Sequence, residues 1–298
     1  MMSGWNATVN EWNQFWFTPR MPHEISVVRI AIGMVATLHF VQYLLIGMDW
    51  YGPAGWFGPN TGRYFIGEGI SGTGSAFRWS MLYSYPALVH AVSIIGIFAS
   101  LAMLLGLGSR LSPFVAWGAM GMFHHRAPFL TLLHEPLLNA SLVYLMIEPG
   151  RRTWTVRPGL ASGTDRVSAN IPIRLIMIHL WIWMAFSLAS MLANDIWWTG
   201  EAGSLLIQTN GGSRVFPADW PILSQFLAHF IITLQIAFLA CMLQPTWRWM
   251  SRWLIYLFAL CILLLLVDWM YAATLMAMSF APWPPKFYIG KRNDEPFY

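Results

Sequence analysis

The sequence of 298 residues predicts an all-α protein, a polytopic transmembrane helix bundle of about seven spans. Hydrophobic residues make up 57% of the chain and charged residues only 10%, whereas soluble domains carry about 25% charged residues. The apolar residues gather in runs of about 20, the length of helix that crosses the roughly 30 Å of hydrocarbon in a bilayer. Many of the 18 tryptophans stand at the ends of these runs, where amphipathic rings favour the membrane interface.

The chain divides into three predicted parts: an interfacial segment over residues 1–23, a transmembrane domain over 24–280 and a polar tail over 281–298. Pro19 and Pro22 are expected to break any helix before the first span. The clear apolar runs predict single helices over residues 25–48, 87–107, 172–192, 222–243 and 253–280.

Residues 111–147 are harder to assign, because polar residues interrupt the apolar pattern there. One run contains His124-His125-Arg126, and the run after Pro136 has only about a dozen residues, a length that suits re-entrant or buried helices. Two crossings and a re-entrant pair are both compatible with this pattern.

The distribution of arginine favours two crossings. Short loops rich in arginine prefer the cytoplasm. Arg20, Arg110, the cluster at 151–166 and Arg248 all obey this rule if an even number of crossings separates Arg110 from that cluster. The resulting prediction is seven spans, with the amino terminus inside and the carboxyl-terminal tail outside.

Several function classes are disfavoured by what the sequence lacks. The net charge of +4 is small and the arginines are scattered, so no nucleic-acid partner is expected. No serine or cysteine is framed as a nucleophile elbow, and no phosphate-binding glycine motif occurs. Cys241 and Cys261 lie inside apolar runs, which is typical of inert thiols. A transporter is disfavoured because no internal repeat is found.

Ionisable side chains inside the predicted hydrocarbon region are expensive to bury, so each is a functional hypothesis. The candidate polar pocket consists of His124, His125, Arg126, His134, Glu135, His179 and Asp268. His39 and His229 are single histidines in other predicted spans. Two interpretations remain open. Either Arg126 pairs with Glu135 or Asp268 for structural reasons, or the residues form a pocket with a proton-relay or ligand-binding group.

No metal site is expected from this pattern, and no catalytic residue is assigned. His124 and His125 are adjacent rather than four residues apart, so their rings point about 100° apart on a helix. Two rings placed in this way cannot easily face one metal ion.

Four short stretches, taken in order, resemble one membrane family. Residues 19–30 form a loop that leads into a helix with Arg29 near its start, and a Tyr-Gly-Pro-Ala-Gly loop follows at 51–55. Residues 124–128, leading to Glu-Pro-Gly-Arg-Arg-Thr-Trp-Thr-Val at 148–156, resemble a central motif with a Pro-Gly turn. The segment from Trp197 through Gly200 to Ala202 is similar to a Trp-x-x-Gly-x-Ala ending. The family is that of the horizontally transferred transmembrane (HTTM) domains, which includes the vitamin K-dependent γ-carboxylase.

The residue that would start carboxylation is missing. In the family enzyme a lysine just before the Trp-x-x-Gly segment is the catalytic base, and here Met191 and Leu192 occupy those positions. Neither side chain can accept a proton. Thr155-Val156 also replaces the family's Ser-hydrophobic-Asp ending. Carboxylation of glutamate is therefore not expected.

The resemblance implies two functional hypotheses. The first is a non-carboxylating membrane component that binds a partner or organises a complex, with another membrane or extracytoplasmic protein as that partner. The alternative is an oxidoreductase or binding protein for a quinone-like lipid, served by the region of His124, His125 and Arg126. No cofactor is assured by either hypothesis. In both, the chain is an integral membrane protein, of the inner membrane if the source is bacterial.

Overall fold

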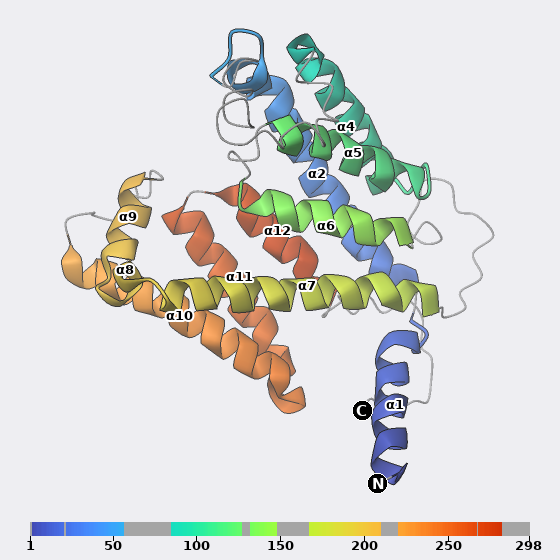
Figure 1. Ribbon diagram of the computed structural model, residues 1–298, viewed down its shortest axis with the longest axis vertical. Coiled ribbons are helices and arrows are strands. Elements are labelled where there is room, and N and C mark those ends of the chain that lie inside the picture. The colour runs from blue at the N-terminus through green and yellow to red at the C-terminus, as the bar shows by residue number, and fades with distance from the viewer. Residues whose placement is uncertain are drawn as a thin grey trace, which may run out of the picture.

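The computed structural model describes residues 2–20, 22–56, 85–126, 132–147, 167–209, 220–266 and 268–281. Every regular element within these ranges is a helix, which confirms the predicted all-α class (Figure 1). The loop at 57–84, the motif segment at 148–156 and the polar tail at 282–298 lie outside the described residues.

Within the described ranges, three helices are long and apolar enough to cross a membrane: α2 (Pro22–Tyr51), α7 (Val167–Leu192) and α10 (Pro221–Leu243). Large apolar side chains on these helices face outwards as well as inwards, and Phe186 and Ile222 are 73% and 83% exposed. Helices that are hydrophobic all round suit a core or a lipid environment rather than a water-facing surface. These features are compatible with the predicted membrane protein.

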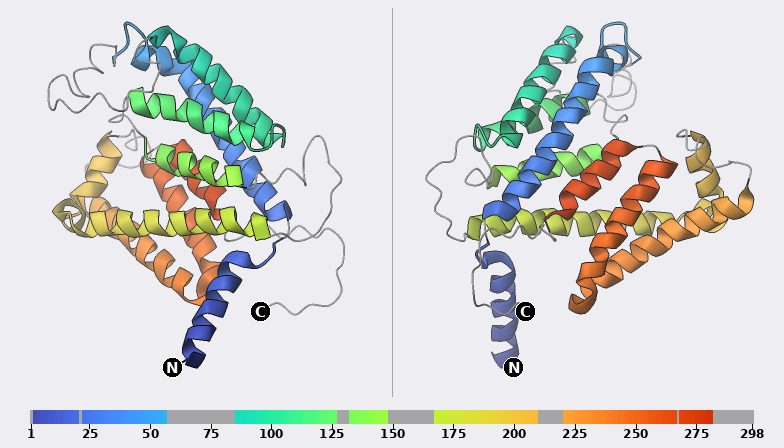
Figure 2. Two further views of the ribbon diagram at one scale, coloured as in Figure 1. Left: turned by 45° about the vertical axis from the view of Figure 1, so that its right-hand side comes forward. Right: turned by 180° about the vertical axis from the view of Figure 1, so that it is seen from behind.

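The first four helices after the amino-terminal segment form one side of the bundle. α4 (Val89–Leu104) lies along α2, and α5 (Leu111–Arg126) and α6 (His134–Ile147) follow, each in contact with the helix before it (Figures 1 and 2). Gly96 permits the close approach of α4 to α2, because a Cβ atom there would lie 2.4 Å from the Phe40 ring. α7 then crosses the bundle and contacts α2, α6 and α10.

Two helices, α5 and α6, are described within residues 111–147, and both open predictions agree with them. α5 has 16 residues and α6 has 14, which correspond to lengths of about 24 Å and about 21 Å. Each is shorter than the roughly 30 Å of a hydrocarbon core. The two helices therefore leave the number of full crossings open.

The predicted single helix over residues 253–280 is wrong. The chain instead forms α11 (Arg248–Leu265) and α12 (Trp269–Ser279), which lie side by side as a hairpin (Figure 2). Asp268 leaves the helical conformation (φ −90°, ψ 82°), and its carboxylate accepts a hydrogen bond from the backbone N–H of Tyr271 at 2.9 Å. Asp268 is thus the N-cap of a new helix rather than a residue in the middle of a span.

Short elements join the long helices. The 3₁₀ turns η3 (Pro86–Leu88) and η6 (Pro245–Trp247) precede α4 and α11, and α8 (Asp195–Trp198) and α9 (Glu201–Thr209) connect α7 to α10. α7 begins five residues before Pro172, so this proline lies inside the helix and not at its start as predicted.

The segment predicted to be interfacial forms a helix, α1 (Met2–Phe17), and ends before the proline that starts α2. Its last turn is fixed to α7. Asn170 Nδ2 donates to the carbonyls of Phe15 and Trp16 at 2.8 and 2.9 Å, and Arg174 Nε donates to the Phe15 carbonyl at 3.1 Å. Carbonyls in the last turn of a helix have no partner within the helix, so α7 supplies the donors that end α1.

Candidate functional site

Six polar side chains from four parts of the chain lie together inside the bundle. We call them the His–Glu cluster: His39 and Tyr43 of α2, His124 of α5, His134 and Glu135 of α6, and Asp268 before α12. The elements that meet here are separated by as much as 229 residues of sequence, from His39 to Asp268.

Glu135 occupies the first turn of α6, and its side chain is only 1% exposed. The first turn of a helix has free N–H groups and a positive dipole end, which favour a carboxylate. The backbone N–H of Glu135 donates to the Leu132 carbonyl at 3.0 Å, which fixes the approach of the chain to the helix. The position of this buried acid is therefore set by the start of α6.

Both oxygens of the Glu135 carboxylate contact side chains from other helices. The Tyr43 hydroxyl donates to Oε1 at 2.5 Å, and His124 Nε2 lies 2.9 Å from Oε2. The Tyr43 ring stacks on Phe123, with ring centroids 4.2 Å apart. A buried carboxylate is costly unless it is paired or hydrogen-bonded; Tyr43 of α2 supplies a hydrogen bond and His124 of α5 supplies an ion-pair contact.

His39 and His134 contact each other through their ring nitrogens. His39 Nδ1 lies 3.1 Å from His134 Nε2, and both side chains are 1% exposed. Because a neutral imidazole has one donor and one acceptor nitrogen, one ring of the pair donates and the other accepts. His39 stands one helical turn before Tyr43, so α2 points both side chains at α6.

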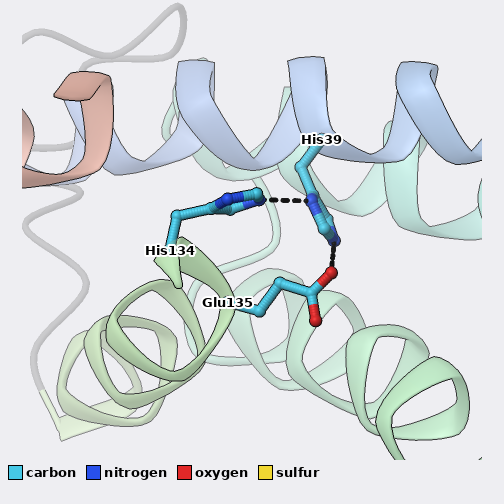
Figure 3. A group of neighbouring side chains, drawn as sticks. All are labelled: His39, His134 and Glu135. Carbon is cyan, nitrogen blue, oxygen red and sulfur yellow. Dashed lines mark hydrogen bonds and ion pairs between the residues drawn. The ribbon is translucent and has the colours of Figure 1, made fainter. Parts of the chain in front are cut away.

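The second nitrogen of each ring faces a carboxylate at a longer distance. His39 Nε2 is 4.0 Å from Glu135 Oε1, and His134 Nδ1 is 4.0 Å from Asp268 Oδ1. Neither nitrogen has a hydrogen-bond partner among the described residues. Figure 3 shows the His39 ring between His134 and Glu135, so one side chain links the other two.

The cluster forms a polar path with buried residues in its middle and less buried residues at its ends. In order, the path runs through His124, Glu135, His39, His134 and Asp268. The terminal side chains are 17% and 25% exposed, whereas the three inner ones are 1% exposed. An imidazole can take up a proton at one nitrogen and release it from the other. The arrangement can therefore store protons or pass them through an apolar interior.

Four of the predicted pocket residues meet in the cluster: His124, His134, Glu135 and Asp268. His179 does not join them, because its Nδ1 lies 3.0 Å from the Tyr144 hydroxyl and links α7 to α6 instead.

The predicted pairing of Arg126 with Glu135 or Asp268 stays a prediction. Tyr43 and His124 contact the two oxygens of the Glu135 carboxylate. Arg126 is the last residue of α5, and its side chain lies outside the described part of the structure. His125, next to it, is half-buried.

The predicted polar pocket does not include two residues of the His–Glu cluster, His39 and Tyr43. The sequence indicates His39 only as a single histidine in another span, and it gives no signal for Tyr43 alone. Their spacing of four residues on an apolar helix, which puts both on one face, is the signal that could have paired them. Nothing in the sequence indicates that this face meets a segment about 90 residues further on.

The residues of the family resemblance belong to two parts of the chain, with Arg29 in α2 and with Trp197 and Gly200 in the connection from α7 to α10. Arg29 is 1% exposed inside α2, and Trp197 belongs to α8. Gly200 adopts a positive φ of 84°, and its carbonyl accepts a hydrogen bond from Ser224 of α10 at 2.5 Å. A Cβ atom at Gly200 would lie 2.3 Å from the Gln225 side chain, so the turn requires glycine for two reasons.

The positions that correspond to the family's lysine end α7. Met191 packs partly against the apolar core, and Leu192 is 38% exposed. The Leu192 carbonyl accepts a hydrogen bond from the Trp198 indole at 2.9 Å. Met191 and Leu192 are thus the last two residues of α7, and Leu192 is hydrogen-bonded to α8.

No family model, curated protein or solved structure matches this chain. The functional argument therefore depends on the geometry of the His–Glu cluster.

Proposed function

We propose that this chain is a multi-pass membrane oxidoreductase or binding protein for a quinone-like lipid, and that the His–Glu cluster exchanges protons with that ligand. The observation that carries the proposal is the polar path from His124 to Asp268. It uses both ring nitrogens of His39 and both of His134. A structural ion pair needs only two partners, whereas this path has five members.

The surroundings of the path favour a lipid-soluble ligand. Phe123 and Tyr51 lie beside Tyr43, with ring centroids 5.5 Å apart from each other, and the helices around them are apolar. Oxidation and reduction of a quinone change the number of protons on its oxygens, so a site for it needs groups that donate and accept protons. Histidine is the side chain best suited to both roles near neutral pH. The resemblance to the HTTM family, with its vitamin K pocket, supports the same ligand class.

The membrane topology is part of the proposal. We take α5 and α6 as the two crossings between Arg110 and residue 151, which gives six crossings up to α10 with the amino terminus in the cytoplasm. The hairpin of α11 and α12 takes the place of the predicted seventh span. α5 and α6 are short, so together they would cross a locally thinned or protein-filled part of the bilayer.

Mass spectrometry of the lipids that copurify with the protein in mild detergent tests the proposed ligand. We expect a quinone at a constant ratio to protein in the wild type and its loss in the His124→Ala and Glu135→Gln variants. His90 is an exposed histidine on α4, so His90→Ala is the matched control and should keep the lipid. Wild-type protein that carries no quinone, and binds no added decylubiquinone, would exclude this ligand class.

A second candidate function, partner binding, is favoured by one surface of α10. A shallow groove of about 410 Å³ is lined by residues of this helix, and three of them are polar: Gln225, His229 and Thr233. They stand at four-residue intervals on an exposed face of a helix that is long enough to span a membrane. Polar groups on such a face are costly in lipid. Gln225 donates to the Thr199 carbonyl, and His229 and Thr233 bond to carbonyls one turn earlier in α10, so a neighbouring helix would have to add to these contacts or replace them.

The mass of the purified complex distinguishes partner binding from binding of a quinone-like lipid. If α10 binds a partner, replacing Gln225 and Thr233 by leucine should reduce the mass of the complex in native mass spectrometry. The same variant should leave the lipid content unchanged. An unchanged mass would remove the support for partner binding at this groove.

A further inference from the structure

We infer that the His–Glu cluster binds a divalent transition-metal ion, with His39, His134 and Glu135 as its protein ligands (Figure 3). One donor atom from each of the three side chains lies within 4.8 Å of the other two. The inference rests on the proposed function in so far as it names a cofactor for the same cluster. Its test has a separate readout, which is metal content rather than lipid content.

The spacing of the donor atoms suits a metal after small movements of the side chains. Bonds of 2.0–2.1 Å in a tetrahedral site place the donors about 3.4 Å apart. Each side chain offers one ligand atom, and the three atoms lie within 4.8 Å of one another; His39 Nε2 is 4.0 Å from Glu135 Oε1. These separations exceed 3.4 Å, so the side chains would have to move closer together to bind one ion.

Buried nitrogens without partners are the second observation. His39 Nε2 and His134 Nδ1 are inaccessible to solvent and have no hydrogen bond among the described residues. Buried polar groups in folded proteins are almost always satisfied, and an exception calls for a specific explanation such as an ion. A metal at His39 Nε2 and His134 Nε2 would use the first of these nitrogens as a ligand, and His134 Nδ1 would carry the N–H that faces Asp268.

The residues next to the three ligands are of the same types as the hydrogen-bond partners of ligands in known metal sites. Ligating histidines commonly donate their other ring N–H to a carboxylate, and ligating carboxylates are themselves hydrogen-bonded. Behind His134, Nδ1 faces Asp268 at 4.0 Å. Behind Glu135, Tyr43 donates to one oxygen and His124 contacts the other.

The ligand set indicates which metals the site would take. Two imidazoles and one carboxylate are typical of Zn²⁺ and of non-haem Fe²⁺, in sites that keep a position open for water or substrate. The carboxylates of Glu135 and Asp268 would balance the charge of a divalent ion in an apolar interior. With the ion bound, His39 and His134 would act as ligands and no longer pass protons, so Tyr43 and His124 beside Glu135 would remain for proton exchange.

Metal content of the purified full-length protein tests the inference. By inductively coupled plasma mass spectrometry we expect about one Zn²⁺ or Fe²⁺ per chain in the wild type, as for a single three-ligand site. We expect near-complete loss in the His134→Gln and Glu135→Gln variants. His90→Ala removes an exposed histidine and should bind as much metal as the wild type. Metal that stays in both cluster variants, or a wild type that binds neither ion after dialysis against it, would overturn the inference.

Co²⁺ titration of the chelator-treated protein provides a readout that does not depend on folding of the ligand variants. Binding at a nitrogen-rich site gives Co²⁺ a visible absorption band, which we expect in the wild type and in Asp268→Asn. Asn also serves as an N-cap, so this variant should keep α12 and lose only the carboxylate behind His134. Loss of an outer partner weakens metal binding by roughly 10–100-fold. Unchanged affinity in Asp268→Asn would contradict the placement of the metal at His134 Nε2.

The two proposals can fail independently. A protein with metal but no quinone would retain the metal site and exclude the lipid ligand. A protein with quinone but no metal would retain the lipid ligand and exclude the metal site.

Discussion

The side chain of Glu135 lies at the centre of the His–Glu cluster. It is almost completely buried, yet it contacts a tyrosine hydroxyl and an imidazole from two other helices. The sequence predicted that His124, His134 and Glu135 are special, because ionisable residues in apolar segments are rare. It could not predict Tyr43, since a tyrosine in an apolar run has no unusual cost and its partner lies 92 residues away.

Replacing Tyr43 by phenylalanine should destabilise the protein while keeping the ring stack with Phe123. The change removes the hydroxyl that donates to the Glu135 carboxylate, and leaving a buried charged acceptor without its donor costs about 1–3 kcal/mol. Unfolding of the detergent-solubilised protein, followed by near-ultraviolet circular dichroism, measures this cost. Tyr85 is 64% exposed, so Tyr85→Phe should change the stability by less than about 0.5 kcal/mol. Equal stability of the two variants would show that the Tyr43 hydroxyl is dispensable.

The sequence also could not exclude metal binding, because the argument against it considered only adjacent histidines. His124 and His125 do point in different directions on α5, and the cluster uses only His124. The two rings that face each other, His39 and His134, come from different helices. The pairing of two such histidines depends on which helix faces pack together, and this packing cannot be inferred from a single sequence.

At the level of elements, the break between α11 and α12 is the largest difference from expectation. Hydropathy is similar on the two sides of Asp268, so the apolar run predicted one long helix. The carboxylate of Asp268 instead caps α12, and the chain reverses there. The other helices agree with their predicted runs to within a few residues, because their ends coincide with loss of apolar character or with proline.

Replacing Asp268 by alanine should loosen the start of α12. The Tyr271 N–H would lose its acceptor, and loss of an N-cap costs about 0.5–2 kcal/mol. Asp268→Asn should keep most of the stability, because asparagine accepts the same bond. Hydrogen exchange at the amides of residues 269–272 would report the difference. Protection that is equal in both variants would show that the break has another cause.

For the whole molecule, the structure supports a helical membrane protein more firmly than it supports a particular number of spans. Three helices are long enough to cross a bilayer, and they coincide with three of the five clear runs in the sequence. α5 and α6 were predicted only as an ambiguous pair, and their lengths leave that ambiguity in place. Orientation relative to a membrane depends on charge bias in the loops, so it has to be measured.

Cysteine labelling of intact cells measures this orientation. In a background with Cys241 and Cys261 replaced by alanine, a membrane-impermeant maleimide should label Gly72→Cys and spare Ser162→Cys. The proposed topology puts the predicted connection with residue 72 outside the cell and the one with residue 162 inside it. After permeabilisation both should react, which controls for burial. The opposite pattern in intact cells would invert the topology, and labelling of both would exclude an even number of crossings between Arg110 and residue 151.

The assembly of the His–Glu cluster from four helices also constrains the order of events during synthesis. The chain emerges amino terminus first, so α2 brings His39 and Tyr43 into the bilayer before α6 is made. When Glu135 is synthesised, Tyr43, which donates a hydrogen bond to its carboxylate, is therefore already present. The carboxylate then does not have to face lipid without a partner. Asp268 is synthesised only after α11. The most exposed residue at the end of the polar path is therefore the last member of the His–Glu cluster to be added.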